Sequence, residues 1–321
     1  MSMKEKILEI LEENKGKSIS GSFIAQKLGI TRSAVWKTVK TLKEEGYIIS
    51  AVTNKGYCLA PGSDILSEQS IKPLLKTHAF GKKMDVFKSI DSTNNFAKSL
   101  AQIGGEHGTV IIAESQTKGR GRLNRNFYSP GGGVYMSIIL RPELSIEDAQ
   151  LITSCAAAAV ARAIQNITGL DAKIKWVNDI FIGGKKVCGI LTEAGMNFET
   201  GKLDYAVVGI GINVNTKHFS GELEKIATSL FAETGKTVLR CNLIAEILNV
   251  FEQYFEKMHT REFMSEYISR SNVIGREVTV TAPGVSYSAV VVGIDQNARL
   301  LVKTQDGEEH ILNSGEISVR F

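Results

Sequence analysis

One short segment of the chain alternates glycine with cationic residues: Gly119-Arg120-Gly121-Arg122, with Lys118 before it and Arg125 after it. Glycine lets a backbone approach a ligand closely, and arginine offers a fixed charge in a fork that matches phosphate and carboxylate. A loop without a ligand has little reason to hold four cations within eight residues, because they repel one another. We therefore expect a loop that binds an anion; the alternative is a patch for nucleic acid or an acidic surface.

A second cluster, Lys175-Trp176-Val177-Asn178-Asp179, is followed by Gly183-Gly184 and by Lys186. The pattern predicts a strand, a polar turn and a hairpin. Lys175 and Lys186 alternate with apolar residues, so each is expected to leave the sheet on a defined face. A lysine aimed into a cleft can neutralise a carboxylate and a phosphate together. A lysine on a solvated sheet face is the alternative.

Small polar residues follow a predicted strand at Asp91-Ser92-Thr93-Asn94. Hydroxyl and amide groups at a strand end can bind the polar head group of a ligand. The same residue types are also common helix caps, which is the simpler interpretation of this segment alone.

Several familiar catalytic signatures are incomplete. Gly16-Lys17-Ser18 and Gly235-Lys236-Thr237 match the end of a P-loop, but a leucine occupies the place of its first glycine in both. The segment Gly209-Ile210-Gly211-Ile212-Asn213 does not match GxGxxG, and close strand packing is the ordinary explanation for its glycines. The sequence contains no HExxH or GxSxG, so metalloprotease and hydrolase-triad chemistry have no support.

Apolar runs and helical patterns in the middle of the chain predict the elements that would position these clusters. The pattern is typical of a mixed α/β or α+β domain of about 200 residues, a size common among enzymes. The expected strands are Met84–Ile90, Thr109–Ala113, Val134–Leu140, Lys173–Trp176, Lys186–Glu193 and Leu203–Ile212, with a helix at Ala149–Thr168. Shorter strands are expected at Glu277–Thr281, Ser288–Ile294, Leu300–Thr304 and His310–Leu312.

The N-terminal segment predicts a winged helix-turn-helix. Apolar spacing indicates a first helix ending near Gly16; Ser20 can cap a second, and Thr31 a third that runs to Glu45. Two short strands around Thr53-Asn54-Lys55 read as a β-hairpin. The outward face of the third helix carries the residues expected to contact DNA: Thr31, Arg32, Ser33, Trp36, Lys37 and Lys40. A three-helix module that binds protein is the alternative.

The charge distribution sets this segment apart. Residues 1–63 hold ten lysines or arginines and six acidic residues, and their balance equals the net charge of +4 for the whole chain. The remainder is therefore neutral. A small basic unit on a neutral body suggests a polyanionic partner for that unit, although a solvated basic surface gives the same count.

Length and composition limit the class of protein. The chain has 321 residues, 43% of them hydrophobic and 22% charged, which fits two or three globular domains and excludes a wholly disordered chain. We expect domains at 1–63, 64–270 and 271–321, with Pro61-Gly62-Ser63-Asp64 as a linker. No apolar run reaches membrane-spanning length and no signal peptide is evident, so no membrane is expected. Four dispersed cysteines fit a reducing cytoplasm.

Taken together, the segments resemble the bifunctional biotin protein ligases that also act as biotin operon repressors. The resemblance runs from end to end of the chain and rests on five motifs in a fixed order behind a winged helix. The motifs are Asp91-Ser92-Thr93-Asn94, Gly119-Arg120-Gly121-Arg122, Lys175-Trp176-x-Asn178-Asp179, Lys186-x-x-Gly189-Ile190-Leu191-x-Glu193 and Gly209-x-Gly211-x-Asn213. One departure is Val177, where the family usually has proline, so the turn loses a fixed φ.

The resemblance implies an α+β fold and a reaction in two steps. The fold would comprise a winged helix-turn-helix, a central mixed-sheet domain like those of biotinyl and lipoyl ligases, and a small SH3-like C-terminal barrel. Biotin and ATP, with Mg²⁺, would give biotinyl-5′-AMP, and the biotinyl group would pass to a lysine of a biotin carboxyl carrier protein. Lys186, Arg120 and Arg122 would be the catalytic residues, with Lys186 on the biotin carboxylate and the acyl phosphate.

The resemblance also implies roles for the remaining residues. The biotin site would comprise Ser92, Thr93, Asn94, Gln116, Arg120, Gly121, Arg122 and Lys186, and the nucleotide site Lys175, Trp176, Asn178 and Asn213. Asp179 would assist as a carboxylate near Mg²⁺ or as a base, and no residue is expected to be a dedicated metal ligand.

As a repressor, the protein would bind operator DNA as a homodimer when it holds biotinyl-AMP. A lipoate or octanoate ligase, and a DNA regulator that binds ligand without ligase activity, are the alternatives. The winged helix and the Gly-Arg-Gly-Arg segment favour biotin over lipoate, and Lys186 with the arginines favours an enzyme.

Overall fold

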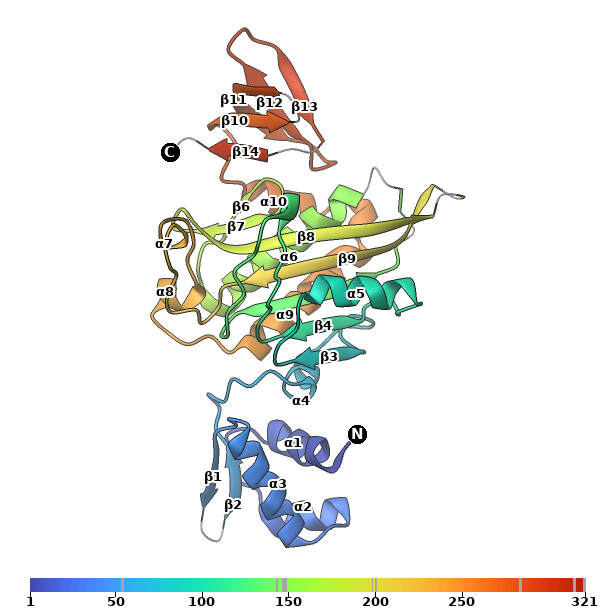
Figure 1. The fold of residues 1–321 in the computed structure, drawn as a ribbon, viewed down its shortest axis with the longest axis vertical. Coiled ribbons are helices and arrows are strands. Elements are labelled where there is room, and N and C mark those ends of the chain that lie inside the picture. The colour runs from blue at the N-terminus through green and yellow to red at the C-terminus, as the bar shows by residue number, and fades with distance from the viewer. Residues whose placement is uncertain are drawn as a thin grey trace. The chain divides into compact units, whose positions relative to one another are not determined.

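The computed structural model describes residues 1–52, 55–142, 144–145, 149–197, 199, 201–282, 285–313 and 316–319 (Figure 1). Contacts between residues divide the chain into two compact units. One comprises Met1–Lys76 with Leu239–Ala245, and the other Thr77–Val238 with Glu246–Phe321. The expected domain boundaries after residues 63 and 270 stay predictions.

The first unit contains the predicted winged helix-turn-helix. Its helices are α1 (Met3–Glu13), α2 (Gly21–Leu28) and α3 (Arg32–Glu44), and each begins at a hydroxyl side chain that accepts a hydrogen bond from the first turn. Strands β1 (Ile49–Val52) and β2 (Gly56–Leu59) pair antiparallel. Of the predicted hairpin turn, Thr53 and Asn54 lie outside the described residues. The apolar faces meet in a core that includes Ile7, Leu11, Ile24, Val35, Val39, Leu42 and Leu59.

The same unit includes a segment distant in sequence. Helix α9 (Arg240–Glu256) begins in this unit and continues in the other. Buried Arg240 binds Asp64 through its main-chain N–H and its Nε, both at 2.7 Å, and through Nη2 to the Asp64 carbonyl at 2.6 Å. Two short helical turns, α4 (Glu68–Ile71) and η1 (Lys72–Leu74), complete the unit.

The second unit is built on a mixed seven-stranded sheet. The strands, in spatial order, are β3 (Met84–Phe87), β4 (Val110–Ala113), β5 (Val134–Leu140), β9 (Lys202–Ile212), β8 (Lys185–Asn197), β7 (Asp179–Ile182) and β6 (Lys173–Lys175). Only the β3–β4 pair is parallel among the described strands of this sheet. Every predicted strand of the central domain is present, with ends shifted by a few residues.

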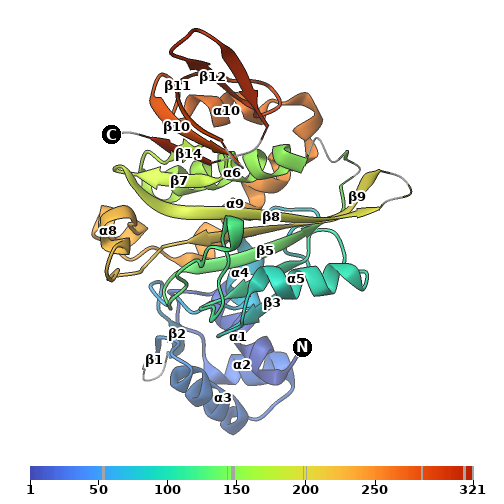
Figure 2. The ribbon, with the colours of Figure 1, turned by 45° about the horizontal axis from the view of Figure 1, so that its top comes forward.

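Helices cover both faces of this sheet (Figure 2). Helix α5 (Thr93–Gln102) packs on β4, β5 and β9, and α6 (Ala149–Thr168), which matches its predicted range, packs on the opposite face. Every residue of β4 and β5 is buried, so both faces of these two strands are covered. Helices α5, α9 and α10 (Phe263–Ser269) lie outside the elements predicted from the sequence.

The remaining helices of the unit are short. They are η2 (Arg122–Asn124), α7 (Leu223–Ile226), α8 (Leu230–Thr234) and η3 (Met258–Thr260). Helix α10 is held to α6 by the Glu266 carboxylate, which accepts hydrogen bonds from Arg162 and Arg270. Among the described residues, no helix combines the length and apolarity needed to cross a bilayer.

The C-terminal part of this unit is a five-stranded antiparallel sheet. Its strands are β10 (Glu277–Ala282), β11 (Val285–Ile294), β12 (Leu300–Thr304), β13 (Glu309–Leu312) and β14 (Glu316–Val319), in the order β13-β12-β11-β10-β14. No ladder joins β13 to β14 in the described residues, so hydrogen bonds do not close the expected barrel. The Ala298 carbonyl accepts hydrogen bonds from Gln150 Nε2 at 2.7 Å and Trp176 Nε1 at 2.8 Å, which fixes this sheet on the central domain.

Candidate active site

A cavity of about 670 Å³ opens over strands β7, β8 and β9 of the central sheet. All twelve residues expected to bind biotin or nucleotide line it, so clusters far apart in the sequence meet in one place. They are Ser92, Thr93, Asn94, Gln116, Arg120, Gly121, Arg122, Lys175, Trp176, Asn178, Lys186 and Asn213. This placement tests neither their individual roles nor the ligand, which stay predictions.

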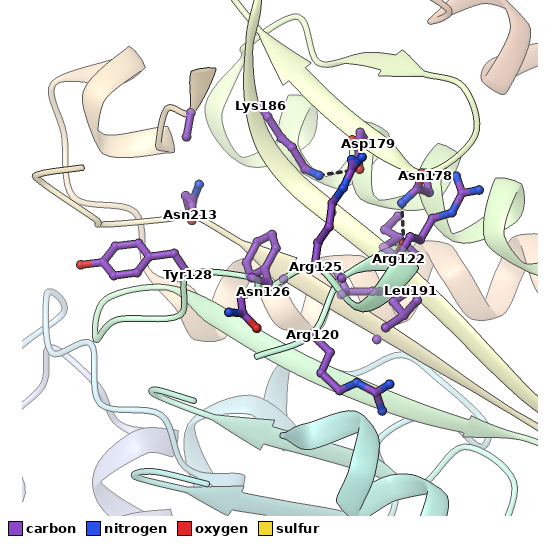
Figure 3. A pocket seen from close by; sticks show the side chains of 18 of the residues that line it. Arg120, Arg122, Arg125, Asn126, Tyr128, Asn178, Asp179, Lys186, Leu191 and Asn213 are labelled. Carbon is purple, nitrogen blue, oxygen red and sulfur yellow. Dashed lines mark hydrogen bonds and ion pairs between the residues drawn. The ribbon is translucent and has the colours of Figure 1, made fainter. Parts of the chain in front are cut away.

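The arginine loop sends its side chains in different directions (Figure 3). Arg122 Nη1 donates to Asn178 Oδ1 at 3.2 Å. Arg120 lies on the other side of the loop from Lys186, where its Nη1 donates to Asn95 Oδ1 at 3.1 Å. Arg125 points from the loop toward the region of Lys186 and Asp179. Of the two arginines expected to be catalytic, Arg122 thus reaches the turn that carries Asn178, while Arg120 attaches the loop to helix α5.

A lysine and a carboxylate form the charged centre of the cavity. Lys186 Nζ lies 2.8 Å from Asp179 Oδ1. The predicted turn and hairpin bring them together, because Asp179 begins β7 and Lys186 lies on β8, close to a register shift between these strands. Glycines at 183 and 184, both with positive φ, make the tight connection.

A chain of hydrogen bonds runs beneath another part of the cavity. The Thr93 N–H and hydroxyl both donate to Gln116 Oε1, at 2.8 and 3.0 Å, and Gln116 Nε2 donates to Ser129 Oγ at 3.0 Å. Ser92 is the N-cap of α5, so the simpler interpretation of this segment is confirmed alongside its place in the cavity wall. These contacts hold two polar segments that are separate in sequence at a common site.

The glycines of β8 and β9 make room for side chains of the cavity, which corrects the expectation of close strand packing. A Cβ on Gly209 would lie 2.0 Å from Asn94 Oδ1, and one on Gly211 would lie 2.6 Å from the ring of Phe127. A Cβ on Gly189 would meet both Phe127 and Lys186 at 3.2 Å. Side chains at these positions would therefore displace Asn94 and Phe127.

Several nucleotide-site candidates are held by the protein itself. Trp176 is buried, and its indole N–H binds Ala298. Asn213 is buried and donates to the Thr228 carbonyl at 3.1 Å, and Asn178 Nδ2 donates to the Ile190 carbonyl at 2.8 Å. The Trp176–Val177 peptide bond, at the departure from the family pattern, is cis. These residues shape the wall of the cavity through fixed backbone contacts.

The cavity is strongly cationic. Its walls carry Arg120, Arg122, Arg125, Lys175, Lys186 and Lys225, and the single acidic residue among the described lining residues is Asp179. Such a surface can bring two anions together, because it offsets the repulsion between them. No group of three or more His, Cys, Asp or Glu residues is placed to hold a metal ion in the described part of the chain.

Aromatic lining residues were missed by reasoning from the sequence. Phe127, Tyr128 and Tyr135 contribute to the wall, with Phe127 between the glycines of the two strands. The adjacent pair Phe127-Tyr128, directly after the cationic loop, could have predicted them, since aromatic side chains commonly line ligand sites. Lys225, on α7, had no comparable signal.

The predicted DNA-contacting residues share the exposed side of α3. Thr31, Arg32, Ser33, Trp36, Lys37 and Lys40 are all exposed. Val35, Val39 and Leu42 are buried against the other helices. Thr31 caps the helix through the Ala34 N–H, and Lys40 Nζ lies 6.0 Å from the centre of the Trp36 ring. The arrangement presents cations and an aromatic ring together to solvent.

Comparisons with known proteins agree over nearly the whole chain. Residues 86–213 match the model of the biotin/lipoate A/B protein ligase family, residues 4–58 a helix-turn-helix domain, and residues 273–320 the biotin protein ligase C-terminal domain. The bifunctional ligase/repressor BirA of Bacillus subtilis is 36% identical over 98% of both chains. That of Escherichia coli is 29% identical over 95% of this chain and 94% of its own.

A solved structure supports the fold of the ligase part. The biotin protein ligase from Aquifex aeolicus in complex with biotin and ATP superposes with a TM-score of 0.65 at 31% identity, covering 74% of this chain and 99% of its own.

Proposed function

The chain belongs to the family of bifunctional biotin protein ligases and repressors, and we propose from this that it attaches biotin to a carrier protein and represses transcription. In the first step a biotin carboxylate oxygen bonds to the α-phosphorus of ATP, and pyrophosphate leaves. In the second step a lysine amine of the carrier bonds to the acyl carbon, and AMP leaves. The observation that carries the proposal is a single cationic cavity in which every residue expected to bind biotin or nucleotide meets.

The polar chain beneath the cavity supports a site for the ureido ring of biotin. This ring offers both N–H donors and a carbonyl acceptor. Ser92, Thr93 and Gln116 offer hydroxyl and amide groups of both kinds. Thr93 and Gln116 are fixed by their mutual contacts, and the Ser92 hydroxyl accepts from the Asn95 N–H. Phe127, inserted beside the glycines of β8 and β9, offers an apolar wall for the rest of the vitamin.

Lys186 is suited to the reacting end. Its ammonium, paired with Asp179 at 2.8 Å, can move to the biotin carboxylate and the α-phosphate when these anions enter. Arg122 and Lys175 would offset charge on the nucleotide, and Trp176, Asn178 and Asn213 would shape its site.

Mg²⁺ fits this site as part of the nucleotide complex. In proteins Mg²⁺ is often held by one or two carboxylates together with substrate phosphates and water, and Asp179 supplies the carboxylate here. When bound, the ion would neutralise phosphate charge that the lysines and arginines leave uncompensated.

The loop with Arg120, Gly121 and Arg122 would cover the intermediate. An acyl phosphate reacts readily with water, so its transfer to a protein needs a site that excludes solvent. Arg122 already reaches Asn178 across the cavity wall, and Gly121 lies in the loop without a side chain to obstruct its approach.

One incubation tests the ligase activity. The full chain is mixed with biotin, ATP, Mg²⁺ and a biotin carboxyl carrier domain, and the carrier is read by mass spectrometry. The proposal requires a mass increase of one biotinyl group that depends on ATP. Lipoate or octanoate in competition decides between substrates: preferential attachment of either acid would contradict the assignment to biotin.

The DNA-binding unit supports the second activity. Its exposed α3 residues would contact operator DNA, with two copies placed on a two-fold operator by a homodimer that forms when biotinyl-AMP is bound. We place the protein in the cytoplasm, where both carrier and DNA are accessible. A gel-shift titration of a biotin operon promoter, with and without biotin and ATP, tests this; equal operator affinity in both conditions would contradict it.

A further inference from the structure

Glu193 lies on β8 and contacts Asn94, one of the residues that line the cavity. Its Oε2 accepts a hydrogen bond from Asn94 Nδ2 at 2.9 Å, and its Oε1 accepts one from Lys98 Nζ at 2.7 Å. Arg120 Nη1 lies 3.7 Å from Oε1. The side chain is partly buried, and it is not among the residues that line the cavity. Its contacts therefore act on the site through Asn94, which does line the cavity.

Both the nitrogen and the oxygen of the Asn94 amide form hydrogen bonds within the protein. Besides Glu193, its Nδ2 approaches the Leu191 carbonyl at 3.3 Å, and its Oδ1 accepts from Ser137 Oγ at 2.7 Å. A carboxylate can only accept hydrogen bonds, so Glu193 determines that the amide nitrogen, and not the oxygen, faces it. The Asn94 oxygen is thereby directed to Ser137, in the space that Gly209 leaves open.

Ser137 connects Asn94 to Thr93, one of the residues proposed to bind biotin. It is fully buried, and its hydroxyl lies 2.8 Å from Thr93 Oγ1 as well as close to Asn94. The Thr93 N–H in turn donates to Gln116 Oε1 at 2.8 Å, and the Thr93 hydroxyl lies within hydrogen-bonding distance of both Ser137 Oγ and Gln116 Oε1. A continuous path of short polar contacts thus joins Glu193 to Thr93 and Gln116, two of the three residues at the proposed ureido site.

We propose that Glu193 is a positioning residue for the biotin ring: it orients Asn94 and, through Ser137, the Thr93 and Gln116 groups that receive the ligand. The inference rests on the proposed function, because it assumes that biotin occupies this part of the cavity. The loss of the Glu193 charge weakens ring binding before any chemistry occurs. The four residues assigned to the nucleotide, Lys175, Trp176, Asn178 and Asn213, take no part in this path, so we expect ATP binding to change little.

The carboxylate is well maintained as an anion. Burial raises the pKa of Glu193. The hydrogen bonds from Lys98 and Asn94, with the charges of Lys98 and Arg120, have a larger opposite effect, so the net pKa is below its usual value. Glu193→Gln retains the size of the side chain and removes this charge. It also presents an amide that can turn its own N–H groups toward Asn94 and disturb the amide orientation.

The decisive measurement is biotin binding by calorimetry in the absence of ATP, together with KM for biotin, KM for ATP and kcat. We expect Glu193→Gln to raise the Kd and KM for biotin roughly tenfold, the scale of one lost charged hydrogen bond, while KM for ATP stays within twofold. Glu106→Gln is the matched control, since it removes a carboxylate from an exposed ion pair with Lys83 in the same unit. It should leave all four constants unchanged.

A double-mutant cycle separates positioning from general damage to the fold. If Glu193 acts through Asn94, Asn94→Ala combined with Glu193→Ala should weaken biotin binding no more than Asn94→Ala alone. Additive losses, or a Glu193→Gln variant with wild-type biotin affinity, would overturn the inference. A variant that lowers kcat and thermal stability but leaves the Kd for biotin unchanged would also overturn it. If the wild-type chain binds no biotin, the proposed function fails instead.

Discussion

Lys186 Nζ and Asp179 Oδ1 lie 2.8 Å apart, and they are the lysine and the carboxylate at the centre of a cavity that is otherwise cationic. The ion pair keeps Lys186 over the cavity before substrates bind. An incoming carboxylate or phosphate would compete with Asp179 for the ammonium, so this pair marks where we expect the reacting anions to meet.

Replacement of Lys186 by alanine should therefore impair adenylation. We expect the rate of pyrophosphate release to fall by about 10²- to 10³-fold, as when a donor to a developing charge is removed. Lys185→Ala is the control, because the neighbouring lysine donates to the Glu224 carbonyl and lies outside the cavity wall. Near-wild-type pyrophosphate release in Lys186→Ala would exclude the proposed role.

Arg122→Ala should weaken the retention of the intermediate. The variant loses the hydrogen bond to Asn178 that links the loop to the opposite wall. We expect biotinyl-AMP to leave the enzyme at least tenfold faster, measured by rapid filtration after a single turnover. Arg122→Lys retains the charge without the planar fork, so its rate of biotinyl-AMP release should lie between those of wild type and Arg122→Ala. An unchanged lifetime of the bound intermediate in the alanine variant would contradict the covering role.

Gly209→Ala should disturb the biotin site through Asn94. The added Cβ would lie 2.0 Å from Asn94 Oδ1, so the amide must shift away from Ser137. Overpacking of this kind lowers the free energy of unfolding by about 1–3 kcal/mol, and biotin affinity should fall with it. Gly131→Ala serves as the control, since nothing lies within 4 Å of its added Cβ. Equal urea midpoints and equal biotin affinities for the two variants would show that the contact is unimportant.

Lys37→Ala and Lys40→Ala should each weaken operator binding without affecting ligation. Both lysines are on the exposed side of α3. If each contacts a phosphate, the slope of log affinity against log salt should decrease in magnitude by about one per substitution. Lys6→Ala removes an exposed lysine of α1 and should leave the slope unchanged. Equal slopes for all three variants would show that Lys37 and Lys40 do not contact DNA phosphates.

Glu266 should make stability depend on acid pH. Burial raises the pKa of this carboxyl, but hydrogen bonds from Arg162 and Arg270 outweigh that effect, and the net pKa lies below its usual 4.5. A carboxylate with a lowered pKa in the folded state stabilises the protein above its unfolded pKa. That contribution is lost as pH falls below about 4.5 and through the folded value.

The measurement is urea unfolding of wild type and Glu266→Gln at neutral and acid pH. At pH 7 the variant should be less stable by about 3 kcal/mol, because buried Arg270 loses its charged partner. The difference should shrink at acid pH as the wild-type carboxyl becomes protonated. A difference that stays constant between pH 7 and pH 4 would contradict the assigned pKa.

Local patterns in the sequence were sufficient for the elements around the main motifs. Helix α6 has its predicted ends, since twenty residues of helical spacing face a covered sheet, and the glycine pair at 183 and 184 marks the hairpin that brings Asp179 to Lys186. Helix α9 was missed. Its apolar spacing is as regular as that of α6, but no motif of catalytic or binding residues lies in that segment.

The contacts between distant segments could not be predicted in this way. Asn94 and Glu193 are 99 positions apart, and they meet only because β5, β9 and β8 lie side by side in an order that local spacing does not determine. Phe127 likewise enters a gap that needs two glycines on neighbouring strands. The motifs therefore identified residues that line the cavity, but not the residues that support them.

The start of helix α9 has a practical consequence for dividing the protein. The DNA-binding unit includes residues 239–245, and Arg240 binds Asp64 from 176 positions further along the chain. An excised fragment that ends at residue 63 or 76 would leave that arginine behind, and would expose the surface that those seven residues cover. A chimera that joins the DNA-binding unit to another enzyme must therefore carry two separate segments, residues 1–76 and residues 239–245.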